Sequence, residues 1–325
     1  MRFVDFTGNE RIKEQLTYLI ESGRLPHAVL IEGEEGIGKH TLAREIALNL
    51  LCRSEDKPCC ECSQCKKVIK GIHPDIIEYT APDMPAKFSV KKVREIREDA
   101  FTQPNEADYK IYILGNCQSM TPSAQNALLK ILEEPPSYVI IILLVTNKSA
   151  MLETVLSRSV VLTLESVNAV EGAEYICSKE ESVSYEDALS ACEIWNGNIG
   201  KALNSLNDGK LSETGELTDR IAKALLADNE YELIKAVSAF QKDGELLIAS
   251  VSLLKAVFRD ALTGGEDLMS GQQETAKSLS SRLSRDKLLK LIGVCDNIIS
   301  LVKGNGNKNI IITKLCYDLR RAIGR

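Results

Sequence analysis

The first half of the chain alternates short apolar runs with stretches of helical periodicity. Short runs rich in β-branched and aliphatic residues are typical of buried strands. The run at 139–145 is apolar throughout, as expected for a central strand that helices cover on both faces. This alternation of strands and helices predicts a parallel α/β sheet. The predicted strands are 27–31, 76–79, 111–114, 139–145 and 160–164, and helices are predicted to end at 51 and to span 90–100 and 123–132.

Strand patterns stop after residue 165, and helical patterns follow. The segment 184–187, Ser-Tyr-Glu-Asp, opens a helix in the manner of a capping box. Between 288 and 302, apolar residues recur at helical spacing, which predicts a stripe that faces a core. That stripe consists of Leu288, Ile292, Cys295, Ile299 and Val302.

A chain of 325 residues is longer than a single hydrophobic core usually organises. We therefore expect an α/β fold followed by an all-α part. The predicted domains are an α/β domain at 1–165, a small helical domain at 166–208 and a larger helical domain at 209–325.

The composition limits the partners and the compartment. The net charge of −6 gives no general attraction for nucleic acid, so any such contact must be local or shared with other subunits. The apolar runs are shorter than the roughly 20 residues of a membrane span, and the first residues lack the apolar segment of an export signal. We therefore expect a cytoplasmic protein with no membrane contact, whose ten cysteines are reduced thiols or metal ligands.

The segment 33–39, GEEGIGK, fits the pattern G-x-x-x-x-G-K of a phosphate-binding loop between a strand and a helix. Its glycines let backbone N–H groups turn towards phosphate oxygens, and the N-terminus of the helix adds a favourable field. The hydroxyl that normally follows the lysine and binds magnesium is replaced by His40, which is either a surface residue or a replacement phosphate contact; we favour the surface residue. A hydroxyl one position later points about 100° away around the helix, so it is a poor substitute. The candidate loop residues are Gly33, Gly36, Gly38, Lys39 and Thr41.

A second departure lies at the end of the strand 111–114. Nucleotide-hydrolysing proteins usually carry carboxylates there, which hold magnesium and orient water, but this chain continues with Gly115 and Asn116. Together with His40, this removes the magnesium contacts and the water-orienting carboxylate. We therefore expect that the chain does not hydrolyse ATP, and the sequence leaves open whether the loop still binds nucleotide.

Five of the ten cysteines lie between residues 52 and 65. Short C-x-x-C spacing wraps backbone N–H groups around a metal, and four thiolates satisfy a tetrahedral zinc ion, which predicts a structural zinc site with no open position. A redox C-x-x-C pair and unliganded thiols are the alternatives. Cys60 is an alternative ligand to Cys59, and His73 is a further spare ligand. The predicted zinc ligands are Cys52, Cys59, Cys62 and Cys65.

These features together resemble the delta-prime subunits of bacterial DNA polymerase III clamp loaders, which are AAA+ proteins. The matching motifs span nearly the whole chain and are specific as a set, although the acidic pair of the second nucleotide motif is Gly115-Asn116 here. The resemblance implies a parallel-sheet AAA+ domain with an inserted zinc loop, a small helical lid domain and a C-terminal helical collar. The motifs are His27-Ala28, the phosphate loop, the cysteine insertion, His73-Pro74-Asp75, AQNALLK at 124–130 and LEEPP at 132–136.

The resemblance also implies a role for Arg158. The family carries a Ser-Arg-Cys motif after the sheet, which reads Ser157-Arg158-Ser159 here, and its arginine reaches into the nucleotide site of a neighbouring ATPase subunit. A planar, permanently charged guanidinium suits the charge that develops on a transferred phosphate. Thr146-Asn147 match a first sensor and Lys201 matches a second sensor, and both are interpreted as remnants. The implied partners are the motor (gamma/tau) and delta subunits, and the sliding clamp and primed DNA through the assembled ring.

Two other functions remain as alternatives. An active AAA+ motor ATPase would require an acidic pair after Leu114 and a hydroxyl directly after Lys39, and this chain has neither. A zinc-dependent nucleic-acid-binding protein would require a basic surface around the cysteines. Lysines do occur there, at 57, 66, 67 and 70, but Glu55, Asp56 and the net charge of the chain oppose them.

Overall fold

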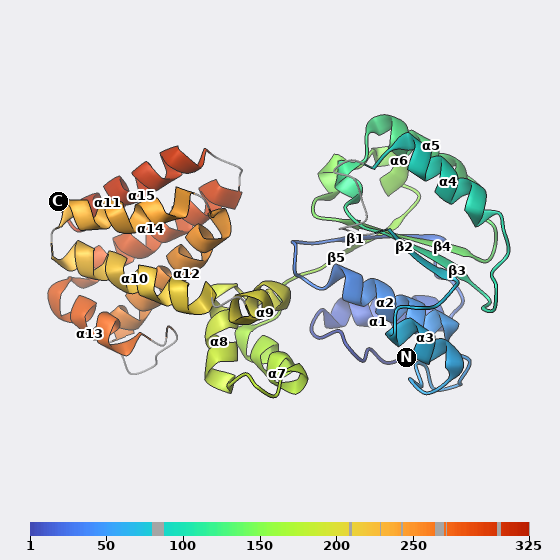
Figure 1. The fold of residues 1–325 in the computed structure, drawn as a ribbon, viewed down its shortest axis with the longest axis horizontal. Coiled ribbons are helices and arrows are strands. Elements are labelled where there is room, and N and C mark those ends of the chain that lie inside the picture. The colour runs from blue at the N-terminus through green and yellow to red at the C-terminus, as the bar shows by residue number, and fades with distance from the viewer. Residues whose placement is uncertain are drawn as a thin grey trace. The chain divides into compact units, whose positions relative to one another are not determined.

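The computed structural model describes residues 1–79, 88–207, 210–227, 229–241, 243–263, 270, 272–303 and 307–324. The chain forms two compact units, Met1–Ser166 and Val167–Arg325 (Figure 1). Each unit has its own buried apolar core. No helix among these residues is long and apolar enough to cross a membrane.

The first unit is built on a five-stranded sheet with the order β2-β3-β4-β1-β5. All adjacent strands run parallel, which confirms the predicted parallel sheet. Because the strands are parallel, their carboxyl ends meet at one edge, and the loops that follow them lie together there. The strands are β1 (Ala28–Glu32), β2 (Ile76–Tyr79), β3 (Lys110–Leu114), β4 (Val139–Val145) and β5 (Val160–Thr163).

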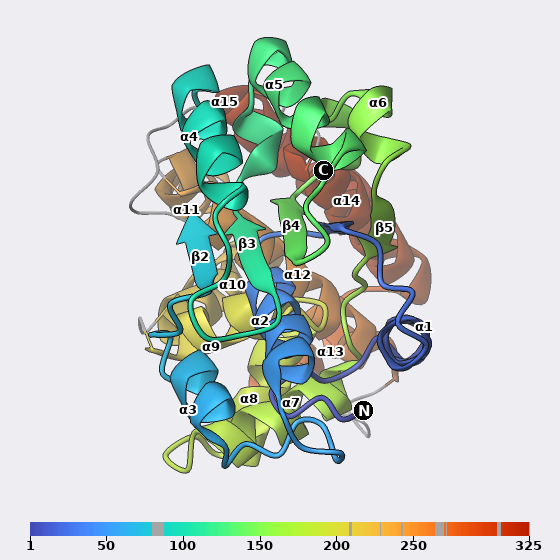
Figure 2. The ribbon, with the colours of Figure 1, turned by 90° about the vertical axis from the view of Figure 1, so that its right-hand side faces the viewer.

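Helices cover both faces of this sheet, with α1, α2 and α3 on one face and α4, α5 and α6 on the other (Figures 1 and 2). Successive residues of a strand point to opposite faces, so Val29 and Ile31 join the core under α2 while Leu30 joins the core on the opposite side. Every residue of β4 is buried, as its apolar run predicts. The helices are α1 (Glu10–Glu21), α2 (Lys39–Leu51), α3 (Ser63–Ile69), α4 (Val90–Ala100), α5 (Pro122–Glu133) and α6 (Glu153–Leu156), with short 3-10 helices η1 (Cys117–Ser119) and η2 (Lys148–Ala150).

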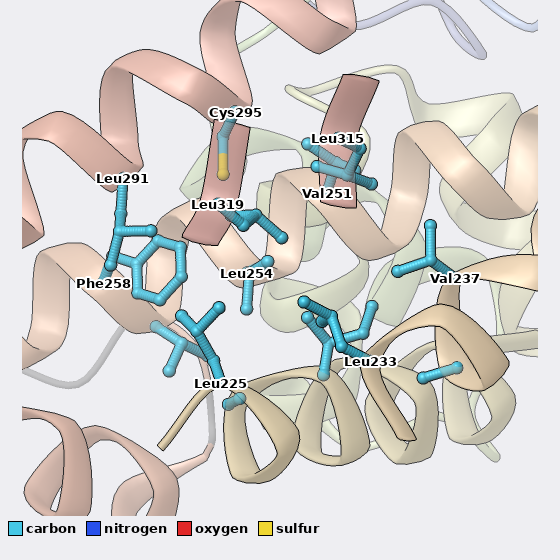
Figure 3. Packing of buried hydrophobic residues seen from close by; sticks show 14 of the residues in the cluster. Leu225, Leu233, Val237, Val251, Leu254, Phe258, Leu291, Cys295, Leu315 and Leu319 are labelled. Atoms are coloured by element: carbon cyan, nitrogen blue, oxygen red, sulfur yellow. The ribbon is translucent and has the colours of Figure 1, made fainter. Parts of the chain in front are cut away.

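The second unit is helical throughout its described residues. Cys295 and Leu288 of the predicted stripe are buried in its larger core, and Ile292, Ile299 and Val302 pack against that core. Figure 3 shows Leu254 and Phe258 from α12 and Leu291 and Cys295 from α14 as members of this core. The helices are α7 (Ala169–Lys179), α8 (Tyr185–Ile194), α9 (Ile199–Asn207), α10 (Lys210–Leu226), α11 (Glu230–Ser238), α12 (Gly244–Thr263), α13 (Gln273–Arg282), α14 (Arg285–Lys303) and α15 (Lys308–Ala322), with η3 (Ala239–Gln241).

A smaller core joins α7, α8 and α9. It also takes in Ala249 and Leu253 of α12, whereas Val251 and Leu254 of the same helix belong to the larger core. The helix α12 therefore ties both cores into one compact unit. The predicted division into 166–208 and 209–325 stays a prediction, because the boundary at 208–209 lies outside the described residues.

Candidate functional site

The phosphate loop follows β1 and leads into α2 at the carboxyl edge of the sheet. Gly36 and Gly38 adopt left-handed backbone angles, with φ of 82° and 100°, which side chains other than glycine rarely accept. A Cβ on Gly38 would also lie 3.3 Å from the ring of Phe6. Gly38 is the N-cap of α2, so backbone N–H groups at this helix end have no side-chain cap from it. Gly36 and Gly38 therefore stand where the backbone of this turn favours glycine, and its role as a phosphate loop stays a prediction.

The loop lysine contacts the loop itself. Lys39 Nζ donates to the carbonyl oxygens of Gly33, at 2.6 Å, and Glu34, at 2.7 Å. These bonds fold the ammonium group back over the turn. His40 is exposed, in agreement with its interpretation as a surface residue, and Thr41 is half-buried in the first turn of α2.

The end of β3 carries no charge. The N–H of Gly115 donates to the carbonyl of Tyr79, at 2.8 Å, and Asn116 is left-handed with φ of 54°. Two residues later, Gln118 Oε1 accepts from the N–H of Thr146 at 3.3 Å and so joins the ends of β3 and β4. Asn147, the matched first sensor, caps η2 through a 2.8 Å bond from Ser149 N–H to its Oδ1. At the positions of the usual acidic pair, backbone and amide groups therefore take the place of carboxylates.

A carboxylate that the sequence analysis missed lies at the same edge. Glu32, the last residue of β1, accepts from the N–H of Lys148 at 2.9 Å and from Thr163 Oγ1 at 2.8 Å, and it forms an ion pair with Lys148 Nζ at 3.1 Å. Burial would raise the pKa of Glu32, but the hydrogen bonds and the charge of Lys148 outweigh it and lower the pKa. Glu32 is thus ionised, and it links the end of β1 to Thr163 of β5 and to Lys148, which follows β4. Its position at the end of a predicted strand was the available signal.

The four predicted cysteines come together in the first unit. The sulfur atoms of Cys52, Cys59, Cys62 and Cys65 all lie within 4.8 Å of one another, and those of Cys59 and Cys65 are 3.9 Å apart. Four sulfurs at about 2.3 Å from a tetrahedral zinc ion would lie about 3.8 Å apart, so the cluster fits such an ion after small adjustments. This group of four cysteines could therefore bind a metal such as zinc.

Backbone N–H groups point at these sulfurs. The N–H of Cys62 donates to Cys59 Sγ and the N–H of Cys65 donates to Cys62 Sγ, both at 3.4 Å. Hydrogen bonds from the N–H groups of Cys62 and Glu61 lower the pKa of Cys59. Burial would raise the pKa of Cys62, but N–H groups of Cys65 and Arg53 outweigh it and lower the pKa to about 6. Burial raises the pKa of Cys65, in contrast. The backbone N–H groups thus favour the thiolate form that metal ligands require at Cys59 and Cys62.

The two spare ligands lie outside the cluster of four. Cys60 takes a left-handed backbone with φ of 59° between Cys59 and the next ligand. His73 is buried, and both of its ring nitrogens are engaged: Nδ1 accepts from the N–H of Asp75 at 3.1 Å, and Nε2 contacts Gln64 Oε1 at 2.5 Å. In this arrangement His73 is a neutral ring that donates from Nε2, and burial lowers its pKa accordingly.

Asp75, of the His-Pro-Asp motif, is fully buried and organises the loop before β3. Its Oδ1 accepts from the backbone N–H and the side-chain amide of Asn105, and its Oδ2 accepts from the N–H groups of Glu106 and Ala107. Burial would raise the pKa of Asp75, but these hydrogen bonds outweigh it and lower the pKa. The motif therefore holds residues 105–107 in place with one carboxylate.

The same loop holds the cysteine segment. The carbonyl of Glu106 accepts from Arg53 Nη2, at 2.7 Å, and from Gln64 Nε2, at 3.3 Å. Its carboxylate pairs with Lys67 at 2.5 Å. Through Glu106, the cysteine segment is thus attached to the sheet by side chains from both ends of the segment.

Arg158 lies in the turn after α6. Its Nη2 pairs with Glu133 Oε1 at 2.9 Å, and its Nη1 donates to the carbonyl of Thr154, at 3.0 Å, and to Ser157 Oγ, at 3.4 Å. The side chain of Arg158 is 37% exposed, so the guanidinium lies at the surface of its unit. Lys201 lies in α9 of the second unit, with its Nζ 5.9 Å from the centre of the Trp195 ring.

Comparisons with known proteins agree with this assembly of motifs. Residues 8–168 match the model of the family described as DNA polymerase III, delta subunit. The chain is 28% identical over 257 residues to DNA polymerase III subunit tau/gamma of Haemophilus influenzae, covering 77% of this chain and 37% of that protein. It is 28% identical over 271 residues to the gamma subunit of Buchnera aphidicola, covering 80% of this chain and 74% of that protein. It is 26% identical over 258 residues to the tau subunit of Escherichia coli, covering 77% and 40%.

Solved structures include two neighbours from Thermotoga maritima. A DNA polymerase III gamma subunit-related protein has a TM-score of 0.44 and 18% identity, covering 95% of this chain and 99% of that one. The RuvB branch migration motor has a TM-score of 0.43 and 16% identity, covering 86% and 89%. The chain spans less than two thirds of the length of the Haemophilus and Escherichia relatives. By these sequence matches, the chain is similar to subunits of the bacterial DNA polymerase III clamp loader, and the delta-subunit family model covers residues 8–168, just under half of its 325 residues.

Proposed function

We propose that this chain is the non-hydrolysing delta-prime subunit of a DNA polymerase III clamp loader. The observation that carries the proposal is the uncharged end of β3, where Gly115 and Asn116 stand in place of magnesium-binding carboxylates. Phosphoryl transfer in loop-containing ATPases depends on magnesium and on an oriented water. Glu32, the nearby carboxylate at the end of β1, is engaged by Lys148 and Thr163, which supports the absence of hydrolysis.

In this proposal Arg158 completes the nucleotide site of a neighbouring motor subunit in an assembled ring. Its half-exposed guanidinium and its place in the Ser-Arg motif support this role. Arginine fingers in other phosphoryl-transfer enzymes raise the rate by roughly 10³ to 10⁵. The ring would include motor (gamma/tau) and delta subunits and would act on the sliding clamp and primed DNA. Thr146, Asn147 and Lys201 would be structural remnants of the sensors.

The test is ATP turnover by the purified chain and by the assembled loader with clamp and primed DNA. We expect no magnesium-dependent turnover by the chain alone, and a loss of at least tenfold in the loader when Arg158→Ala is introduced. Arg44→Ala is a matched control, since Arg44 also pairs with a glutamate of the same unit, Glu78, at 2.8 Å. Full turnover in the Arg158→Ala loader would refute the finger, provided that the ring still assembles.

A second candidate is an active motor subunit, because the relatives described above carry the names gamma and tau. It predicts stoichiometric ATP turnover by the isolated chain. That turnover should then disappear in Lys39→Ala. The same measurement on the isolated chain thus separates the two functions.

We also propose that Cys52, Cys59, Cys62 and Cys65 hold a structural zinc ion. The mutual distances of their sulfurs and the N–H groups that face Cys59 and Cys62 support this. When bound, the ion would neutralise the thiolates and fix the segment 52–65. Metal analysis of the purified chain should give about one zinc per chain, and a chain without zinc would refute the proposal.

A further inference from the structure

The guanidinium of Arg158 is held by its own chain. Glu133 Oε1 accepts from Nη2 at 2.9 Å, and the carbonyl of Thr154 accepts from Nη1 at 3.0 Å. Glu133 lies 25 residues before Arg158 on the neighbouring element α5 (133 against 158 in the sequence). The contact thus joins the motif LEEPP to the motif Ser-Arg, two motifs whose connection the sequence does not reveal.

The position of Glu133 is unfavourable for a carboxylate in isolation. Glu133 is the last residue of α5, Glu134 is its C-cap, and Pro135-Pro136 come next and prevent the helix from continuing. The C-terminus of a helix carries a partial negative charge, so an acidic residue there is disfavoured unless a cation offsets it. Lys130 lies in the same last turn, and Arg158 pairs with Glu133 directly. The guanidinium of Arg158 therefore helps to offset a carboxylate that the end of this helix disfavours.

The ion pair between Arg158 and Glu133 is weak enough to break. The side chains of Arg158 and Glu133 are 37% and 48% exposed, and ion pairs in such surroundings are screened by water and salt. A triphosphate offers an arginine two parallel charge-assisted hydrogen bonds and more charge than a single carboxylate. A phosphate that approaches Arg158 can therefore compete with Glu133, but it must first displace it.

We propose that Glu133 is a positioning residue that retains Arg158 on its own chain until a nucleotide phosphate of the neighbouring subunit displaces it. This inference rests on the proposed function and adds a restraint to it. The ion pair lowers the fraction of time that the guanidinium is available. Resting turnover in the loader, before clamp and DNA are bound, is thereby kept low, while turnover in the fully engaged state is set by Arg158 itself.

The first test uses the isolated full chain and does not depend on ATP. Phenylglyoxal modifies free guanidinium groups, and peptide mass spectrometry reports the rate at Arg158. Glu133→Gln keeps the size of the side chain and removes its charge, and we expect it to raise this rate about two- to fivefold, the range expected for a half-exposed ion pair. Glu134→Gln removes the neighbouring charge, which is also exposed, and should leave the rate unchanged. Equal rates in both variants would overturn the proposed restraint.

The second test uses the assembled loader. Glu133→Gln should raise the resting ATPase kcat about two- to fivefold without changing KM, and should leave the rate with clamp and primed DNA within a factor of about 1.5. Adding Arg158→Ala should abolish the increase. A lower resting rate in Glu133→Gln, or no difference from Glu134→Gln, would overturn the inference alone. Normal turnover in Arg158→Ala would instead refute the proposed function, whatever the result with phenylglyoxal.

Discussion

The replacement of Asp75 by asparagine tests how one buried carboxylate holds the loop 105–107. Asp75 is fully buried, and its two oxygens accept four hydrogen bonds, three from backbone N–H groups and one from the Asn105 amide. Asparagine retains one oxygen and presents an NH₂ group where the other oxygen was. If the retained oxygen faces Glu106 and Ala107, a flip of the Asn105 amide can satisfy the NH₂ group, but the Asn105 N–H remains without an acceptor. In the opposite orientation, two N–H groups are left.

The number of N–H groups left without an acceptor sets the expected loss of stability. A buried N–H left without an acceptor costs about 1–3 kcal/mol, and the loss of charge assistance adds to it, so Asp75→Asn should lower the free energy of unfolding of the first unit by about 2–4 kcal/mol at pH 7. The pKa of Asp75 is lowered in the folded state. Its carboxylate therefore contributes stability above the pKa of the unfolded chain, and this contribution is lost as the pH falls through the folded pKa. The difference between wild type and variant should shrink in acid accordingly.

Hydrogen exchange measured by mass spectrometry is the suitable assay, because Trp195 lies in the other unit and its fluorescence reports on that unit. Peptides that contain the amides of Glu106 and Ala107 should lose protection in Asp75→Asn at pH 7. Asp108→Asn removes an exposed charge from the same loop and is the control. Unchanged protection at 105–107, together with an unchanged urea midpoint of the first unit, would show that the hydrogen bonds of Asp75 do not stabilise the fold by this amount.

Four further predictions concern other sites. Cys62→Ser should lower the bound zinc at least tenfold in a competition assay with a chromophoric chelator, whereas Cys60→Ser should retain it; equal loss in both would contradict the ligand set. Gly38→Ala should lower the free energy of unfolding by about 1–2 kcal/mol, because φ is 100° and a Cβ would lie 3.3 Å from Phe6. Gly293→Ala, inside α14 with nothing within 4 Å of the new Cβ, should instead stabilise by about 0.5–1 kcal/mol in urea unfolding. Burial raises the pKa of Glu193 from 4.5 to about 7. Between pH 4.5 and 7 the folded chain therefore holds a proton that the unfolded chain has lost, so the stability falls as the pH rises through this range. Glu193→Gln should therefore stabilise the second unit at pH 8, by about 1 kcal/mol after allowance for partial exposure, and should have little effect at pH 4. Urea unfolding followed by Trp195 fluorescence measures this. A difference in stability between variant and wild type that did not change with pH would contradict the prediction.

The sheet was predictable because its strands are short, apolar and separated by helical patterns. The run of β4 is buried along its whole length, and its seven residues suit a strand better than a helix. The cysteine cluster was predictable for a related reason, since C-x-x-C spacing brings ligands together through local backbone geometry. In both cases the information lies within a few residues of the chain.

The contacts that position the candidate site were not predictable in this way. Asp75 reaches a loop 30 residues later, and Glu32 meets Lys148 and Thr163 from 116 and 131 residues away. No periodic pattern in the sequence predicts that Glu133 and Arg158 form a pair. Such contacts depend on the order of strands in the sheet, which places α5 and α6 beside each other, and local sequence patterns carry little of that information.

The side chain of Lys39 binds the phosphate loop of its own chain. Its ammonium group satisfies the carbonyls of Gly33 and Glu34, at 2.6 and 2.7 Å, so a phosphate would have to draw Lys39 away from both. A ligand that binds the folded state raises its stability with concentration. Because breaking these two bonds opposes phosphate binding, they make the stability of the first unit less sensitive to the concentrations of ATP and ADP than an open loop would be.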